Sequence, residues 1–188
     1  FTGVDFTKEY DLENTLNLII TCARHLETET RQELMGILEK LGDSEPTITI
    51  TNMSGILTAE TKLEPIEVVK KIKEMLLDEP WCIRYCLRII PIQKITETKI
   101  ESIEEGITDL IKLISNGESY RISIEKRNSN ISSQELISRV AKKIENKVSL
   151  EFPDKIILIE VLGNKTGIAI VKKEDILSVE KTKRSISE

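Results

Sequence analysis

The sequence contains few of the residues that metal proteins and disulfide-bonded proteins rely on. It has one histidine, His25, and three cysteines, Cys22, Cys82 and Cys86. An odd number of cysteines gives no disulfide framework, and a single histidine cannot complete a zinc site of two cysteines and two histidines. We therefore expect no metal. The cysteines are interpreted as small buried apolar residues in a reducing compartment, the cytoplasm.

Catalytic and nucleotide-binding motifs are also missing. The eight glycines are scattered and form neither GxGxxG nor GxxxxGK[ST], which argues against a nucleotide cradle. The HExxH, GxSxG and zinc-deaminase patterns do not occur. His25 follows a predicted strand and is interpreted as a surface histidine rather than a catalytic one. The sequence thus favours a binding module without a cofactor over an enzyme.

No apolar run reaches the length of about 18 residues that a membrane-spanning helix needs. The charge, in contrast, is distributed unevenly. Residues 1–118 carry 13 basic and 22 acidic side chains, a balance of −9, whereas residues 119–188 carry 14 basic and 10 acidic ones, a balance of +4. This asymmetry indicates that an anionic partner meets the C-terminal part of the chain.

The N-terminal part alternates between strand and helix patterns. Strands are predicted where apolar and polar residues alternate, and helices where apolar residues recur every three to four positions. The resulting order, β-α-β-β-α-β, is the ferredoxin-like pattern. The predicted strands are 16–22, 47–51, 56–59 and 81–92, and the predicted helices are 28–41 and 65–77.

A second α/β unit follows a connector at residues 93–98. It begins with a regular helix over 99–115, and continues with a strand at 120–127, a helix at 132–146 and strands at 156–161 and 168–171. The fold class is α+β, with α/β character in the second unit. The predicted division is an N-terminal arm (1–14), a ferredoxin-like domain (15–96), a second domain (97–175) and a polar, frayed C-terminal tail (176–188).

Several basic residues fall in positions where they would share a surface. Arg84 and Arg88 are four apart in a predicted strand and would point to the same face, where they either meet RNA or pair with local acids. In the second unit, Arg121 and Arg127 share one face of a strand and Lys126 emerges at its end. A helical patch and two loop positions complete the set: Arg139, Lys142, Lys143, Lys155 and Lys165.

Residues 97–175 resemble a THUMP domain, the RNA-binding module of tRNA-modifying enzymes. The resemblance rests on the helix at 99–115, the strand that ends in Lys126-Arg127, and the approach to a strand at Val148–Asp154, which is similar to the family pattern V-D-L-x-x-P-[DE]. A preceding ferredoxin-like subdomain also fits the family. The resemblance implies tRNA as the partner and adds weight to Lys126-Arg127 as phosphate contacts.

Aromatic residues make up only 4% of the chain, and Tyr120 and Phe152 are the ones beside the basic positions. We therefore expect recognition of RNA shape and phosphate rather than extensive base stacking. Phe152-Pro153 is interpreted as a rigid turn with a core anchor.

Three functions remain open. The C-terminal stretch resembles stand-alone THUMP adaptors, which implies a non-catalytic protein that presents the acceptor end of tRNA, with its 3′ CCA tail, to an RNA cytidine acetyltransferase. An RNA-binding fragment of a tRNA thiouridine synthetase or THUMP methyltransferase would look the same. The third is a ferredoxin-like protein–protein module without RNA.

Overall fold

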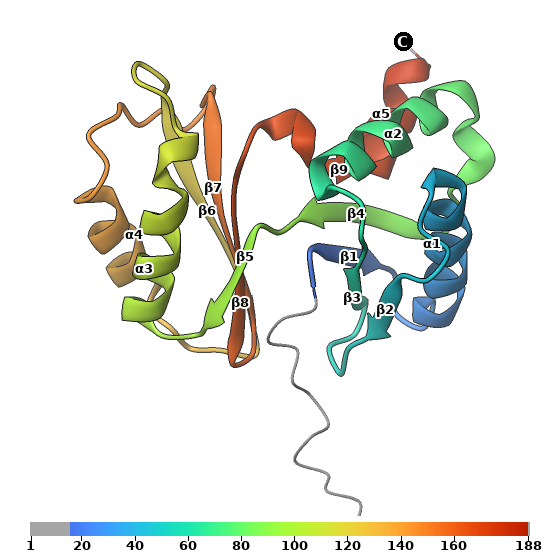
Figure 1. Cartoon of the computed structure of the whole chain (residues 1–188), viewed down its shortest axis with the longest axis horizontal. Coiled ribbons are helices and arrows are strands. Elements are labelled where there is room, and N and C mark those ends of the chain that lie inside the picture. Colours follow the sequence, from blue (N-terminus) through green and yellow to red (C-terminus); the bar gives the residue numbers. More distant parts are fainter. Residues whose placement is uncertain (1–15, 188) are drawn as a thin grey trace, which may run out of the picture.

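The computed structural model describes residues 16–187, and the arm expected at 1–14 lies outside this range (Figure 1). Two β-sheets face each other in the middle of the molecule, and helices cover the outer face of each sheet. The molecule therefore has an α-β-β-α arrangement. Within the described residues, no helix is both long enough and apolar enough to cross a membrane.

The first domain has the predicted ferredoxin-like topology. Its antiparallel sheet has the order β2-β3-β1-β4-β9, so the predicted pattern of strands is confirmed and a short fifth strand is added at the β4 edge. The alternation in β1 places Leu18 and Ile20 in a core beneath the helices, and the opposite side of the strand faces the second domain. The elements are β1 (Leu18–Cys22), α1 (Glu27–Leu41), β2 (Thr47–Ile50), β3 (Ile56–Glu60), α2 (Pro65–Asp78), the 3₁₀ turn η3 (Pro80–Cys82) and β4 (Cys86–Pro91).

Local sequence signals define the helix ends in this domain. The Glu64 carboxylate accepts hydrogen bonds from the backbone N–H groups of Ile66 and Glu67, which caps α2, and Pro65 occupies the first turn. Helix α1 ends at Gly42, whose φ of 113° is one that glycine adopts without strain. The two helices predicted in this domain, 28–41 and 65–77, are therefore confirmed to within one residue at each end.

The second domain is built on a mixed sheet of order β5-β8-β7-β6, in which β6 and β7 run parallel. Helices α3 and α4 cover one face, and their apolar stripes pack on β7 and β8. A parallel pair needs a crossover connection, which α4 provides. The elements are β5 (Lys94–Glu97), α3 (Ile100–Leu110), the 3₁₀ turn η4 (Ile111–Leu113), β6 (Tyr120–Arg127), α4 (Ser133–Ala141), β7 (Lys155–Leu162) and β8 (Lys165–Val171).

The two sheets are joined by a third apolar cluster. Ile90 and Ile92 on the first domain pack with Ile156, Leu158 and Val171 on the second, all of them buried. This cluster fixes how the domains sit against each other, because apolar area removed from water stabilises the contact.

Close approach at this junction depends on a glycine. A Cβ at Gly167 would lie 2.9 Å from Ile92 Cδ1, closer than ordinary carbon–carbon contact. A side chain at this position would therefore push β8 and Ile92 apart.

Two sequence expectations are corrected by the fold. The strand predicted over 81–92 begins only at Cys86, because residues 80–82 form a 3₁₀ turn and Glu33 of α1 accepts hydrogen bonds from the N–H groups of Arg84, Tyr85 and Cys86. Arg84 consequently lies outside β4 and does not share a strand face with Arg88. The connector at 93–98 contains β5, which pairs with β8.

The C-terminal segment is not frayed. After β8 the chain passes through η5 (Lys173–Asp175), returns to the first domain as β9 (Leu177–Ser178) and ends in α5 (Val179–Ile186). Leu177 and Val179 are buried in the first domain's core, and the Lys183 amine donates a hydrogen bond to the Ile83 carbonyl at 2.7 Å. The expectation of a tail is therefore wrong, and the first domain is completed by residues that follow the second.

Candidate functional site: a basic cleft between the domains

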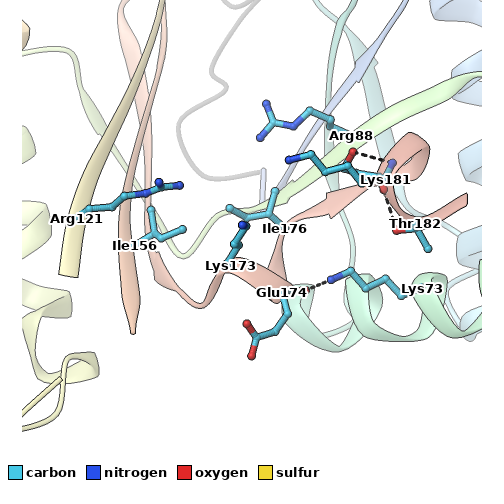
Figure 2. A pocket seen from close by; sticks show the side chains of 10 residues that line it. Lys73, Arg88, Arg121, Ile156, Lys173, Glu174, Ile176, Lys181 and Thr182 are labelled. Carbon is cyan, nitrogen blue, oxygen red and sulfur yellow. Dashed lines mark hydrogen bonds between the residues drawn. The ribbon is translucent and has the colours of Figure 1, made fainter. Parts of the chain in front are cut away.

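A cleft of about 520 Å³ opens between the two domains and is dominated by positive charge (Figure 2). Arg121 reaches in from the second domain, and the side chains of Arg88 and Lys181 point toward the same space from the first. Among the described residues, Glu174 is the single acidic residue of the lining. The lining residues are Lys73, Arg88, Arg121, Ile156, Lys173, Glu174, Ile176, Ser178, Lys181 and Thr182.

The sheet topology explains why these residues meet. Strands β6 and β7 are parallel, so Arg121 and Ile156, each the second residue of its strand, lie at the same end of the sheet. Strand β8 runs antiparallel and ends there, which places Lys173 nearby. The chain then crosses to the first domain and adds Lys181 on α5 beside Arg88 of β4. Each of the five cations thus comes from a different element.

Four of these cations form no ion pair within residues 16–187: Arg88, Arg121, Lys173 and Lys181. Lys73 differs, because its amine donates a hydrogen bond to the Glu174 backbone carbonyl. Burial lowers the pKa of Lys73, and the carboxylates of Glu174 and Asp175 oppose that shift. The cleft therefore offers several positive groups to an anion that spans both domains, and a phosphate backbone has that charge pattern.

A buried ion pair lies on the same side of the second sheet. Arg127 Nη1 donates a hydrogen bond to Glu160 Oε2 at 2.8 Å, and the side chains are 18% and 3% exposed. Burial raises the pKa of Glu160, while the Arg127 hydrogen bond and the nearby charge of Arg88 act to lower it. Arg127 thus holds a carboxylate in place inside the protein, and its contact with RNA stays a prediction.

The predicted helical patch has acidic partners from the neighbouring helix. Arg139 Nε lies 2.8 Å from Glu104 Oε2 and Arg139 Nη1 lies 3.4 Å from Glu101 Oε1. Lys143 Nζ lies 3.3 Å from Glu104 Oε1. Lys142 is exposed and follows the last residue of α4. The sequence pattern placed these basic residues on one surface, but it did not show that α3 brings two glutamates against them.

The other predicted residues are dispersed. Lys155 pairs with Glu118 at 3.0 Å and donates to the Leu113 carbonyl at 2.8 Å. Lys126 donates to the Ile131 carbonyl at 3.0 Å. The Arg84 guanidinium lies 5.6 Å from the centre of the Tyr85 ring, a cation–π contact on the first domain. Lys165 begins β8, at the end of the sheet away from the cleft. Of the ten predicted residues, the cleft contains Arg88 and Arg121.

Sequence reasoning missed Lys73, Lys173 and Lys181. The basic run at residues 181–184 was visible, but it was assigned to a frayed tail rather than to a helix that packs on α2. Lys73 lies on a helix of the acidic N-terminal part, where the charge balance gave no reason to single it out. Only the fold of α5 onto α2 brings these lysines to one place.

The sequence interpretation of Phe152 is also wrong. It was expected to anchor a turn in the core, yet 83% of it is exposed. Leu150, in the same segment between α4 and β7, is 74% exposed. Two large apolar side chains therefore stand in solvent near the start of β6 and β7.

At its other end, the boundary between the domains has an uncharged lining. A cavity of about 420 Å³ there is lined by residues without formal charge, among them Thr49, Met53, Asn128 and Asn164. No group of three or more potential metal ligands occurs in the part of the chain that the structure describes. The positive charge is thus concentrated at one end of the boundary.

Comparison with known protein families identifies the second domain. The sequence model of the THUMP domain matches residues 97–171. No curated protein matches the chain in sequence. The family match covers strands β6, β7 and β8 and helices α3 and α4 of the second domain. It includes Arg121 and Ile156, which line the cleft.

Solved structures share the fold of both domains at low sequence identity. The chain is similar to the PH1313 protein of Pyrococcus horikoshii, with a TM-score of 0.56 and 15% identity over 84% of this chain and 55% of that one. It is similar to TrmN of Thermus thermophilus, with a TM-score of 0.54 and 13% identity over 81% of this chain and 44% of that one.

A third similar structure is a 4-thiouridine synthetase–RNA complex with bound ATP, with a TM-score of 0.51 and 14% identity over 84% of this chain and 42% of that one. The chain therefore spans about half the length of these proteins, or somewhat less.

Proposed function

We propose that this chain, which carries a THUMP domain at residues 97–171, binds tRNA in the basic cleft between its two domains. The observation that carries the proposal is the convergence of five basic side chains from both domains on one cleft, whose described lining contains a single acid. Arg and Lys contacts to phosphate give affinity with little sequence information, which suits a protein that receives a folded RNA by its shape.

The structural comparisons support a role in tRNA modification. One similar structure is that of a 4-thiouridine synthetase bound to RNA, and its likeness covers both domains of this chain. We infer that both domains act together in RNA binding here, since each contributes cations to the cleft.

As the specific role, we propose an adaptor. The chain holds the acceptor end of tRNA, with its 3′ CCA tail, and presents it to an RNA cytidine acetyltransferase that forms N4-acetylcytidine with its own cofactor. In this role the chain performs no chemistry itself. The support is the resemblance of the C-terminal stretch to stand-alone THUMP adaptors, together with a site that is rich in cations and poor in groups suited to acid–base catalysis.

A second role has its own supporting observation. The similar structures are about twice as long as the matched part of this chain, and one of them is a synthetase. The same two domains would then be the RNA-binding part of a thiouridine synthetase or THUMP methyltransferase. The reading frame beyond Glu188 separates the two roles, because the second requires a catalytic domain in the same chain.

Binding to three RNAs tests the proposal: whole tRNA, tRNA trimmed of its CCA tail, and a plain RNA duplex of similar length. We expect the order whole tRNA, trimmed tRNA, duplex, from tightest to weakest, in a gel-shift or fluorescence-anisotropy titration. Equal affinity for all three would refute recognition of tRNA. The adaptor role further requires that the protein stimulate acetylation of tRNA by an RNA cytidine acetyltransferase, and no stimulation would refute it.

A further inference from the structure

The segment between α4 and β7 holds three exposed apolar side chains next to the basic cleft, and Leu150 and Phe152 are the most exposed of them. Phe152 is 83% exposed and Leu150 is 74% exposed. An exposed position for one such residue is ordinary, but a pair of them in a segment of three residues is a feature that folding alone does not favour.

This segment is fixed to the sheet by hydrogen bonds on both sides of Phe152. The Ser149 N–H donates to the Tyr120 carbonyl at 2.9 Å, and the Asp154 N–H donates to the Ser119 carbonyl at 3.1 Å. The Phe152 N–H donates to Ser149 Oγ at 3.3 Å. Pro153 restricts the backbone of Phe152 to extended conformations. The exposed ring is therefore presented by an ordered segment, so little entropy is lost when it meets a partner.

Arg121 connects this segment to the cleft. Its Nη1 donates a hydrogen bond to the Leu150 carbonyl at 3.2 Å, and the same side chain lines the cleft. The segment that carries the aromatic ring is thus tied to one of the cations of a cleft that suits a phosphate backbone. Nucleic-acid sites that hold unpaired nucleotides combine these two elements, because the cations follow the phosphates and the aromatic face stacks on a base.

We propose that Phe152 is a stacking platform for an unpaired base of the RNA that lies in the cleft, with Leu150 supporting the nucleotide from the side. This inference rests on the proposed RNA binding and adds a residue that selects unpaired nucleotides over duplex. It adds one stacked base to the sequence expectation of shape and phosphate recognition without extensive base stacking.

The test compares two labelled RNA hairpins that have the same stem. One has a 3′ overhang of four nucleotides, and the other has an overhang of the same length without bases. We expect the protein to bind the first about tenfold more tightly, because an aromatic side chain gains affinity from each base that stacks on it. The Phe152→Ala variant is expected to lose this preference and to bind the baseless probe as the unmodified protein does. Phe152→Trp is expected to keep the preference.

Two controls separate failure of stacking from failure of RNA binding. Trp81→Ala removes the other strongly exposed aromatic of residues 16–187, 71% exposed on the first domain, and is expected to leave the preference intact. The double variant Arg88→Ala, Lys181→Ala is expected to weaken binding of both probes and to keep the ratio of their affinities.

Fluorescence gives a direct readout of stacking. In a Trp81→Phe, Phe152→Trp protein, the overhang with bases is expected to quench the tryptophan fluorescence, whereas the baseless overhang is expected to leave it unchanged.

The stacking proposal is overturned if the unmodified protein binds both probes equally, or if Phe152→Ala retains the preference. Absence of binding to either hairpin, with whole tRNA still bound, would overturn the stacking proposal alone. Absence of binding to whole tRNA as well would overturn the proposed function. Unchanged RNA binding by Phe152→Ala, with loss of binding to a protein partner, would assign the exposed ring to protein contact instead.

Discussion

Two groups of basic side chains in this molecule look alike in the sequence and differ in their surroundings. On the outer helices, Arg139 and Lys143 lie against Glu101 and Glu104, so their charge is largely matched within the protein. In the cleft, the part of the chain that the structure describes places a single acid beside five cations. The comparison teaches that the count of lysines and arginines is a weaker guide to RNA binding than the acids that the fold brings beside them.

The largest loss of stability is expected at Arg127, a basic residue that lies neither in the cleft nor on the surface. Replacing Arg127 by Ala leaves the buried Glu160 carboxylate without its partner, which costs about 3–5 kcal/mol of unfolding free energy. Urea denaturation measures this loss. The double variant Arg127→Gln, Glu160→Gln is expected to recover part of it, because no unpaired charge remains. A loss below about 1 kcal/mol in the single variant would contradict a structural role for Arg127.

The same variant has a predicted pH dependence. Burial already raises the pKa of Glu160 above its ordinary value of 4.5, and loss of Arg127 removes hydrogen-bond and charge effects that oppose this shift. For a carboxyl group whose folded pKa is raised, the stabilising contribution is present below the ordinary pKa and is lost as pH rises through the folded pKa. The difference in stability between the variant and the unmodified protein is therefore expected to grow from pH 5 to pH 8. A difference that shrinks with rising pH would contradict this reading.

The next largest loss of stability is expected in the C-terminal segment, which carries Lys173 and Lys181 of the cleft. Leu177 of β9 is fully buried in the first domain, so Leu177→Ala is expected to cost about 2–5 kcal/mol by creating a cavity. Thermal or urea unfolding measures the loss. Ile186→Ala on α5, a position that is 42% exposed, is the matched control and is expected to change stability by less than about 0.5 kcal/mol. Equal effects at both positions would show that this segment is not part of the first domain's core.

The smallest effect is expected at the paired cations. The double variant Arg139→Ala, Lys143→Ala removes partly exposed ion pairs, each of which contributes about 0–1 kcal/mol. Its RNA affinity is expected to fall by no more than about twofold at 0.15 M salt, where distant charges are screened. A large loss of affinity would show that the helix face binds RNA and would remove the contrast between the two groups.

The sequence predicted the regular parts of this fold because their signals are local. The alternation in β1 and the stripe of Val69, Ile72 and Leu76 in α2 each identify a buried face without knowledge of the rest. The THUMP resemblance at 97–175 was visible for a similar reason, since its residues are contiguous, and the family model matches 97–171.

The parts that were missed depend on distant partners. Helix α5 has one buried residue, Val179, at its start, so it has no apolar stripe and reads as a polar tail. Phe152 beside a proline resembles a core anchor, and its exposure is decided by the course of the segment around it. The sequence did indicate a buried ion pair at Glu160, because an acid inside the apolar run of β7 requires a buried partner. That partner, Arg127, is 33 residues away and was instead assigned to RNA.

The most direct test of the account is the salt dependence of tRNA binding for three proteins. The unmodified protein, Arg88→Ala with Lys181→Ala, and Arg139→Ala with Lys143→Ala are titrated with tRNA between 50 and 300 mM salt. The cleft variant is expected to bind roughly tenfold more weakly per cation removed, and the steepness of log K against log salt is expected to fall by about 2. The helix variant is expected to match the unmodified protein in both quantities. The reverse pattern, with the cleft variant unchanged and the helix variant impaired, would contradict the account.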